Sequence, residues 1–193
     1  MNDAPDLFSH DEPGPRFKAT DIATAIARGG VPFPTAQARV ANFAKAGLIY
    51  SRGKAANAAK NSPALYSMSD LAAATMLSAV IDCGVSDREI LADASVALYS
   101  WAIGAAPRSV HPILTAAVDT WKDRAWCLQL RFHRNLETDQ RRVNRSFGSM
   151  DSPAVWSSPE LNEVPWVPIG ELVISTAPLA ALQRLVSVPK EAN

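Results

Sequence analysis

The sequence has little cysteine, no net charge and no long apolar run, and each shortage excludes a class of protein. Its two cysteines, Cys83 and Cys127, lie far apart and outside any CxxC motif, which argues against a zinc knuckle or a dithiol redox site. The longest apolar stretch, 71–80, is interrupted by threonine and serine and is much shorter than the ~20 residues of a membrane-spanning helix. Basic and acidic residues both number 19, so the chain as a whole has no bias toward anionic partners.

The composition and the first residues also indicate the cellular location and the number of domains. The first ten residues, MNDAPDLFSH, lack the basic and then apolar pattern of a secretion signal, and we expect a reduced, cytoplasmic protein with no membrane contact. Hydrophobic residues make up 48% of the 193 positions, which is enough for one ordinary domain or two small ones. Residues 1–16 hold three prolines and four acids and are predicted to form a flexible lead.

Charge is distributed unevenly along the neutral chain. Residues 17–66 contain seven Lys or Arg and one Asp, a sum of +6, whereas 67–104 contain one Arg and five acids, a sum of −4. Affinity for nucleic acid depends on the local density of Lys and Arg, because those side chains release counterions from phosphates. The basic segment is therefore a candidate phosphate-binding face, and a solvated surface that lacks acids is the alternative.

Two short helices separated by a tight turn are predicted over 20–28 and 35–46. Glycines follow both segments, where a left-handed residue commonly ends a helix. The prolines of Val31–Pro34 push their predecessors out of the α region, which predicts the turn. Because Val40 and Phe43 define an inner face of the second helix, its amide and cationic side chains are expected to face outward. Two short helices joined by a tight turn in this way are typical of a helix-turn-helix.

A hairpin and two further helices are expected next. Leu48–Tyr50 and Leu65–Tyr66 are β-prone and bracket the small, basic loop 51–64, a pattern typical of the wing that lies beside a recognition helix. Ser69 is predicted to begin a helix that ends near Cys83. A capping box of Ser86 and Glu89 is predicted to open another.

This order of elements resembles the DNA-binding domain of the MerR family of winged-helix regulators, over about 17–92. The resemblance is carried by Ala46-Gly47-Leu48-Ile49, Arg52, Leu65-Tyr66-Ser67, Asp70-Leu71, Gly84-Val85-Ser86 and Glu89-Ile90. It implies a winged helix-turn-helix that binds double-stranded DNA, most often to regulate transcription. Ala41-Asn42-Phe43-Ala44 stands where the family typically has Arg-Tyr-Tyr-Glu, so atypical DNA contacts or a divergent role are allowed for. No heptads follow Trp101, so the family's coiled coil is not carried over. Cys83 lies inside a predicted helix and Cys127 is far from it, so the family's metal sensing is not carried over either.

The candidate DNA-binding residues lie in the second helix and in the wing. They are Thr35, Gln37, Arg39, Asn42 and Lys45 in 35–46, and Arg52, Lys54 and Lys60 in 51–64. Asparagine and glutamine can pair with adenine through two hydrogen bonds, and Arg39 could reach guanine or a phosphate. The wing cations suit phosphates, which give affinity with little sequence selectivity. An exposed helix face without a ligand is the alternative.

The second half reads as a small α+β unit. We expect a helix over 110–122, an alternating strand over 126–133, another strand over 171–175 and a final helix from Pro178. Between the strands lie a charged stretch, 136–145, and a Ser/Pro-rich loop that runs through Pro165. The basic run Arg141, Arg142 and Arg145, with Arg131 and Arg134 nearby, either extends a nucleic-acid face or belongs to a solvated loop.

A few side chains of the second half invite other interpretations. Cys127, His111 and His133 are of the types used as nucleophile, base or soft metal ligand, but no carboxylate lies at a recognisable spacing from the histidines, so no catalytic or metal site is predicted. The tryptophans at 121, 126, 156 and 166 could line a ligand pocket or a subunit contact, or pack in the core.

We therefore predict an α+β protein with a winged helix-turn-helix over 17–104 and a dimerisation or sensor domain over 105–193. The expected function is sequence-specific binding of double-stranded DNA as a homodimeric transcription regulator, without a cofactor and with an unknown small-molecule or protein effector at the second domain. The alternative is a mobile-element or phage-type factor that docks DNA for recombination or packaging. A third hypothesis is an enzyme that uses Cys127 and His133.

Overall fold

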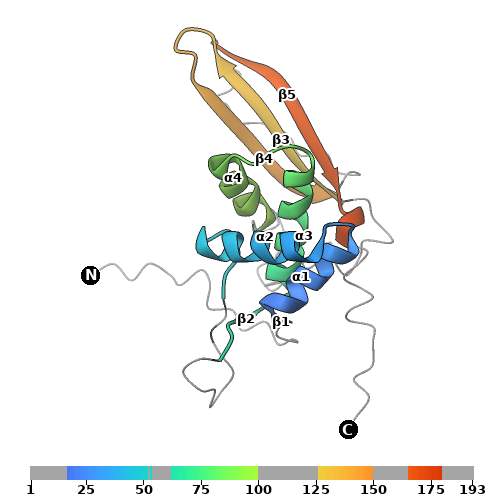
Figure 1. Ribbon diagram of the computed structural model, residues 1–193. Coiled ribbons are helices and arrows are strands. Elements are labelled where there is room, and N and C mark those ends of the chain that lie inside the picture. The colour runs from blue at the N-terminus through green and yellow to red at the C-terminus, as the bar shows by residue number, and fades with distance from the viewer. Residues whose placement is uncertain (1–16, 52, 54–61, 100–125, 150–164, 180–193) are drawn as a thin grey trace, which may run out of the picture.

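The computed structural model describes residues 17–51, 53, 62–99, 126–149 and 165–179. This part of the chain is a mixture of helices and two small antiparallel sheets, which confirms the α+β class. The elements, in chain order, are β1 (Phe17–Lys18), α1 (Ala19–Arg28), α2 (Phe33–Lys45), β2 (Leu65–Tyr66), α3 (Met68–Asp82), α4 (Arg88–Leu98), β3 (Trp126–Asn135), β4 (Arg141–Ser149), β5 (Trp166–Ser175) and the short 3-10 helix η2 (Ala177–Leu179) (Figure 1).

Helices α1 and α2 form the predicted pair around a shared core. Helix α2 begins two residues earlier than expected, because proline is tolerated in a first turn, where the missing N–H has no partner to lose. It buries Ala36, Val40 and Phe43. Fully burying side chains of the size of valine and phenylalanine contributes about 1.5–3 kcal/mol each, so this face fixes the rotation of α2 about its axis.

A Schellman motif ends α2 and turns the chain into the core. Gly47 has φ +70°, its N–H donates to the Ala44 carbonyl at 3.2 Å, and the Leu48 N–H donates to the Phe43 carbonyl at 2.9 Å. Leu48 and Ile49 are then buried as part of this turn. Ser95 on α4 donates to the Leu48 carbonyl at 2.8 Å, which anchors the turn.

The predicted hairpin between 48–50 and 65–66 is wrong. Strand β2 pairs instead with β1, Phe17 opposite Tyr66 and Lys18 opposite Leu65. Residues 48–50 form no strand, because the Leu48 N–H closes the Schellman turn and the Tyr50 N–H donates to the Asp70 carboxylate, while Leu48 and Ile49 are buried in the core. The ends of the loop still approach each other, because the Leu65 N–H donates to the Gly53 carbonyl at 2.9 Å.

Helices α3 and α4 are present as expected, but different residues begin them. Ser67, not Ser69, begins α3: its hydroxyl accepts from the Asp70 N–H at 3.2 Å while the Asp70 carboxylate accepts from the Ser67 N–H at 2.9 Å. Asp87, not Ser86, begins α4, because its Oδ1 accepts from the N–H groups of the next turn at 2.8 and 3.1 Å. A single capping residue thus replaces the predicted capping box of α4.

Strand β3 is the centre of a three-stranded antiparallel sheet, between β4 and β5. The strands predicted over 126–133 and 171–175 are confirmed, and both are longer than expected. Strand β4 was not predicted: its residues were placed in the charged stretch 136–145 and the segment that follows it. Leu128 lies opposite Phe147 on one side and Ile174 on the other, so all three strands contribute to the buried face.

The sheet shares one hydrophobic cluster with the helices. Leu128, Leu130 and Leu179 belong to the same cluster as the cores of α1 to α4. Helix α4 packs on β4 and β3, and η2 packs on α3. In Figure 1 the strands rise away from the helices, with the turn between β3 and β4 at the far end.

Some predictions fall outside the described residues. These are the flexible lead 1–16, the helix over 110–122, the division between 104 and 105, and the final helix beyond η2. Of the final helix, only the 3-10 turn that contains Pro178 is described. Within the described ranges, no helix combines the length and the apolar character that a membrane span requires.

Candidate nucleic-acid interface

The outward face of α2 presents four of the five helix residues that the sequence singled out. Thr35, Gln37, Asn42 and Lys45 are all exposed. They are exposed because Ala36, Val40 and Phe43 hold the opposite face in the core. The buried face of α2 therefore gives these four side chains the predicted outward orientation.

Small side chains separate the polar ones on this face. Pro34, Ala38, Ala41 and Lys45 follow the spacing i, i+4, i+7, i+11, which places them along one side of an α-helix, and all four are exposed. The two alanines leave the helix backbone accessible to close approach, with Gln37 and Asn42 beside them. Sequence reasoning passed over the alanines, although their spacing on a polar helix face was visible.

Arg39 has a different position from the one predicted. Its Nη1 donates to the Ser78 hydroxyl at 2.6 Å and to the Ser78 carbonyl at 3.3 Å, and its Nη2 lies 2.7 Å from Asp82 Oδ1. The Arg39 side chain is 16% exposed. Its guanidinium thus connects α2 to α3 at the border of the exposed face, and it does not point outward with Asn42 and Lys45.

The wing residues Arg52, Lys54 and Lys60 lie outside the described residues, but the base of their loop is described. Asp70, fully buried at the start of α3, accepts hydrogen bonds from the Ser67 N–H and hydroxyl, from the Tyr50 N–H at 3.0 Å and from the Tyr99 hydroxyl at 2.6 Å. The Tyr50 and Tyr99 rings meet edge to face at 5.1 Å. One carboxylate therefore connects the loop, α3 and the end of α4.

Tyr66 lies beside this carboxylate. Burial raises the pKa of the Tyr66 hydroxyl, and the negative charge of Asp70 raises it further. The phenol therefore stays protonated across the physiological range, and the ring packs in the core. This position makes Tyr66 part of the support of the loop rather than an outward stacking platform.

Cys127 and His133 do not form a catalytic pair. Both are buried on β3, six residues apart, and an extended strand advances ~3.3 Å per residue, which separates them by about 20 Å. Burial and the charge of Glu171 raise the pKa of the Cys127 thiol, while burial lowers the pKa of His133. The cysteine is thus held as a thiol, which is a poor nucleophile. His111 lies outside the described residues.

The described residues also contain no group of three His, Cys, Asp or Glu side chains that could hold a metal ion. His133 Nδ1 is buried without a hydrogen-bond partner. That orphaned nitrogen and the lowered pKa of the ring both favour the uncharged imidazole.

The arginines of the basic run and the two near it lie on the sheet and not in a loop: they are Arg131, Arg134, Arg141, Arg142 and Arg145. Three of them form ion pairs: Arg131 with Glu171 at 3.5 Å, Arg134 with Asp139, and Arg145 with Asp93 of α4. Arg142 lies over the Trp166 ring at 5.4 Å. Because carboxylates offset much of their charge, these arginines present less net positive charge than their number alone indicates.

Two of the four tryptophans of the second half are described. Trp126 stacks on Phe147, with ring centroids 6.1 Å apart and an angle of 19° between the rings. Trp166 carries the Arg142 guanidinium on its ring. Both therefore support the sheet, while Trp121 and Trp156 lie outside the described residues.

Neither a protein-family model nor a curated protein matches the chain. The resemblance to MerR regulators thus remains a prediction from the sequence.

Proposed function

We propose that the protein binds double-stranded DNA in a sequence-specific manner, with the outward face of α2 in the major groove. The observation that carries the proposal is the exposed stripe on which Ala38 and Ala41 lie beside Gln37 and Asn42. The alanines permit close contact with base edges and thymine methyl groups, and the amides can each pair with an adenine.

The dimensions of α2 fit this role. Its 13 residues span about 20 Å at 1.5 Å per residue, and the major groove, about 12 Å wide, admits one α-helix. Lys45 ends the exposed stripe, where an ammonium group can reach a phosphate. Helix α1 packs against the buried side of α2 and holds it, as the first helix of a helix-turn-helix does.

The loop after α2 and a second copy of the chain complete this mode of binding. Arg52, Lys54 and Lys60 contact phosphates beside the groove, from a loop whose base Asp70 anchors. Two copies of the chain bind two half-sites, because one small domain buries too little DNA for tight specific binding. A regulator of transcription is the function that best suits such a protein, with an effector acting on the second half.

DNA docking in recombination or packaging is the second candidate, and one observation favours it. The strands of the second half extend away from the helices, so that the β3–β4 turn lies far from α2 (Figure 1). An arm in this position can contact a partner protein while α2 contacts DNA. Higher-order assembly on DNA distinguishes this candidate from a dimeric regulator at a palindromic site.

Fluorescence anisotropy with labelled duplexes at several salt concentrations tests phosphate contact. The proposal predicts that affinity falls steeply as salt increases, because each neutralised phosphate releases counterions. Lys45→Ala should weaken binding to every duplex alike and reduce the salt slope by about one. Gln140→Ala, at an exposed glutamine beyond β3, is the control and should change neither quantity. Absence of salt-sensitive binding to any duplex would contradict the proposal.

A further inference from the structure

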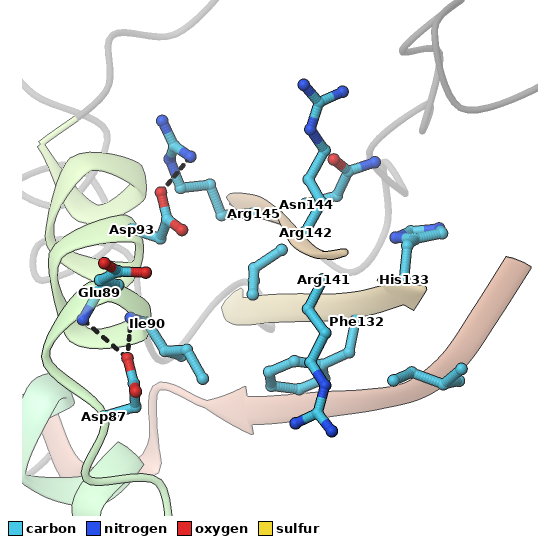
Figure 2. Close-up of a pocket in the computed structure, with 12 residues that line it drawn as sticks. Asp87, Glu89, Ile90, Asp93, Phe132, His133, Arg141, Arg142, Asn144 and Arg145 are labelled. Atoms are coloured by element: carbon cyan, nitrogen blue, oxygen red, sulfur yellow. Dashed lines mark hydrogen bonds and ion pairs between the residues drawn. The ribbon is translucent and has the colours of Figure 1, made fainter. Parts of the chain in front are cut away.

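A cleft opens between α4 and the β3–β4 hairpin, and none of its lining residues belongs to α2. Its volume is about 630 Å³, within the range of ~300–1,000 Å³ typical of small-molecule sites. Figure 2 shows α4 along one wall and the hairpin along the other. The ion pair between Arg145 and Asp93 joins the two walls.

The two walls carry opposite charges. The start of α4 contributes Asp87 and Glu89, and β4 contributes Arg141. Asp93 and Arg145 offset each other as an ion pair, and Arg142 lies over the Trp166 ring. In Figure 2 the acids lie along the helix, whereas Arg141 and Arg142 project in opposite directions from the strand. Apolar side chains complete the lining between them, among them Ile90, Phe132 and Val143.

This arrangement discriminates among ligands by the placement of their charge. The carboxylates of Asp87 and Glu89 repel an anionic group on their side of the cleft, and the Arg141 guanidinium repels a cationic group on the other side. A ligand with a cationic end and an anionic end is attracted by both walls, because low-dielectric walls focus the field between them. His133, which also lines the cleft, adds little charge, because burial lowers the pKa of its ring.

We propose that the cleft binds a zwitterionic molecule with an apolar body, the chemistry of a short peptide with free termini. Its ammonium group lies against Glu89 and Asp87, its carboxylate lies against Arg141, and its apolar part covers Phe132 and Ile90. Glu89 and Arg141 are both exposed and therefore accessible to a ligand from solvent. This inference does not depend on DNA binding, since none of these residues lies on α2.

Calorimetric titration of the full-length protein with three related peptides tests the charge requirement. Trileucine has both free termini, N-acetyl-trileucine lacks the ammonium group, and trileucine amide lacks the carboxylate. We expect trileucine to bind and each blocked peptide to bind about threefold to tenfold more weakly, as the loss of one partly solvated charge contact implies. Absence of trileucine binding, or equal affinity for all three peptides, would overturn the proposal.

Two substitutions locate the binding site. Glu89→Gln should reduce the penalty for acetylating the peptide, and Arg141→Gln should reduce the penalty for amidating it. Gln140→Ala, next to Arg141, is the matched control and should leave all three affinities unchanged. Both positions are exposed, so the variants should fold, which an unchanged melting temperature verifies. If both penalties persist in both variants, the peptide binds elsewhere and the proposal is wrong.

Discussion

Arg39 and Asp82 form an ion pair across 2.7 Å that joins α2 to α3, 43 positions apart in the sequence. The same guanidinium donates to Ser78 at 2.6 Å. The arginine that was predicted to reach guanine or a phosphate thus supports the helix that we propose as the reader of DNA. The exposed amides beside it remain the candidates for base recognition.

Replacing Arg39 should therefore affect stability before it affects DNA recognition. We expect Arg39→Ala to lower the free energy of unfolding by about 1–2 kcal/mol, because charge-assisted hydrogen bonds to Ser78 and Asp82 are lost. Urea denaturation measures this change. Asp82→Ala should cost less than Arg39→Ala, since it leaves the Ser78 contact in place. Unchanged stability of Arg39→Ala together with altered sequence preference would restore Arg39 as a base contact.

Asp70 should be among the most sensitive positions of the described fold. Among its contacts, the carboxylate accepts from four donors, the Tyr50 and Ser67 N–H groups and the Ser67 and Tyr99 hydroxyls, and the amide of Asp70→Asn would turn a donor toward another donor. We expect the substitution to cost about 2–4 kcal/mol, which chemical denaturation measures. Tyr99→Phe, which removes one of the four donors, should cost only about 1 kcal/mol. Equal effects of the two substitutions would show that the network does not act through the carboxylate.

Substitution of Gly47 should lower the stability of the protein, because of the backbone conformation of this residue. Its φ of +70° strains any residue with a Cβ, although a Cβ there would meet open space. Gly47→Ala is expected to lower stability by about 1 kcal/mol. Gly148→Ala on β4 is the control, since that site is equally open and its φ is not positive, and it should be nearly neutral or slightly stabilising. Equal melting temperatures for the two variants would contradict this account.

His133 should make stability depend on pH just below neutrality. Burial lowers its pKa from the ordinary 6.5, so the unfolded chain binds a proton more readily than the folded protein. Stability is therefore greatest above pH 6.5 and decreases as the pH falls toward the lower folded pKa. Urea midpoints at about pH 7.5 and 5.5, where most carboxylates stay ionised, measure the decrease. His133→Leu should reduce it, and an identical decrease in both proteins would assign the effect to other groups.

Local patterns predicted the helices of the described residues well and the strand pairings poorly. The spacing of Val40 and Phe43, together with Gly47, placed α2 within two residues of its ends. Strand β4 was not predicted, because arginine, asparagine and serine interrupt its apolar residues. Its pairing with β3 depends on tertiary contacts, which no local pattern reveals. The pairing of β1 with β2 was missed for a similar reason, since their residues are more than 40 positions apart.

In the candidate site, too, local patterns predicted some features and missed others. The exposure of Gln37 and Asn42 follows from the helical period of α2 alone, so the sequence predicted it. The inward turn of Arg39 depends on Ser78 and Asp82 of another helix, which no local pattern reveals. The cleft also lay beyond sequence reasoning, because its two charged walls come from segments about 50 residues apart.

Selection of genome fragments by the purified protein tests the central claim most directly. Fragments retained at a low and a higher salt concentration would be sequenced for the wild-type protein, for Gln37→Ala, for Asn42→Ala and for the Gln140→Ala control. We predict a few enriched sites with a two-fold motif, changed or lost in Gln37→Ala and Asn42→Ala and kept in Gln140→Ala. Identical sites for all four proteins, or no retention of DNA at low salt, would contradict the proposal that α2 reads DNA.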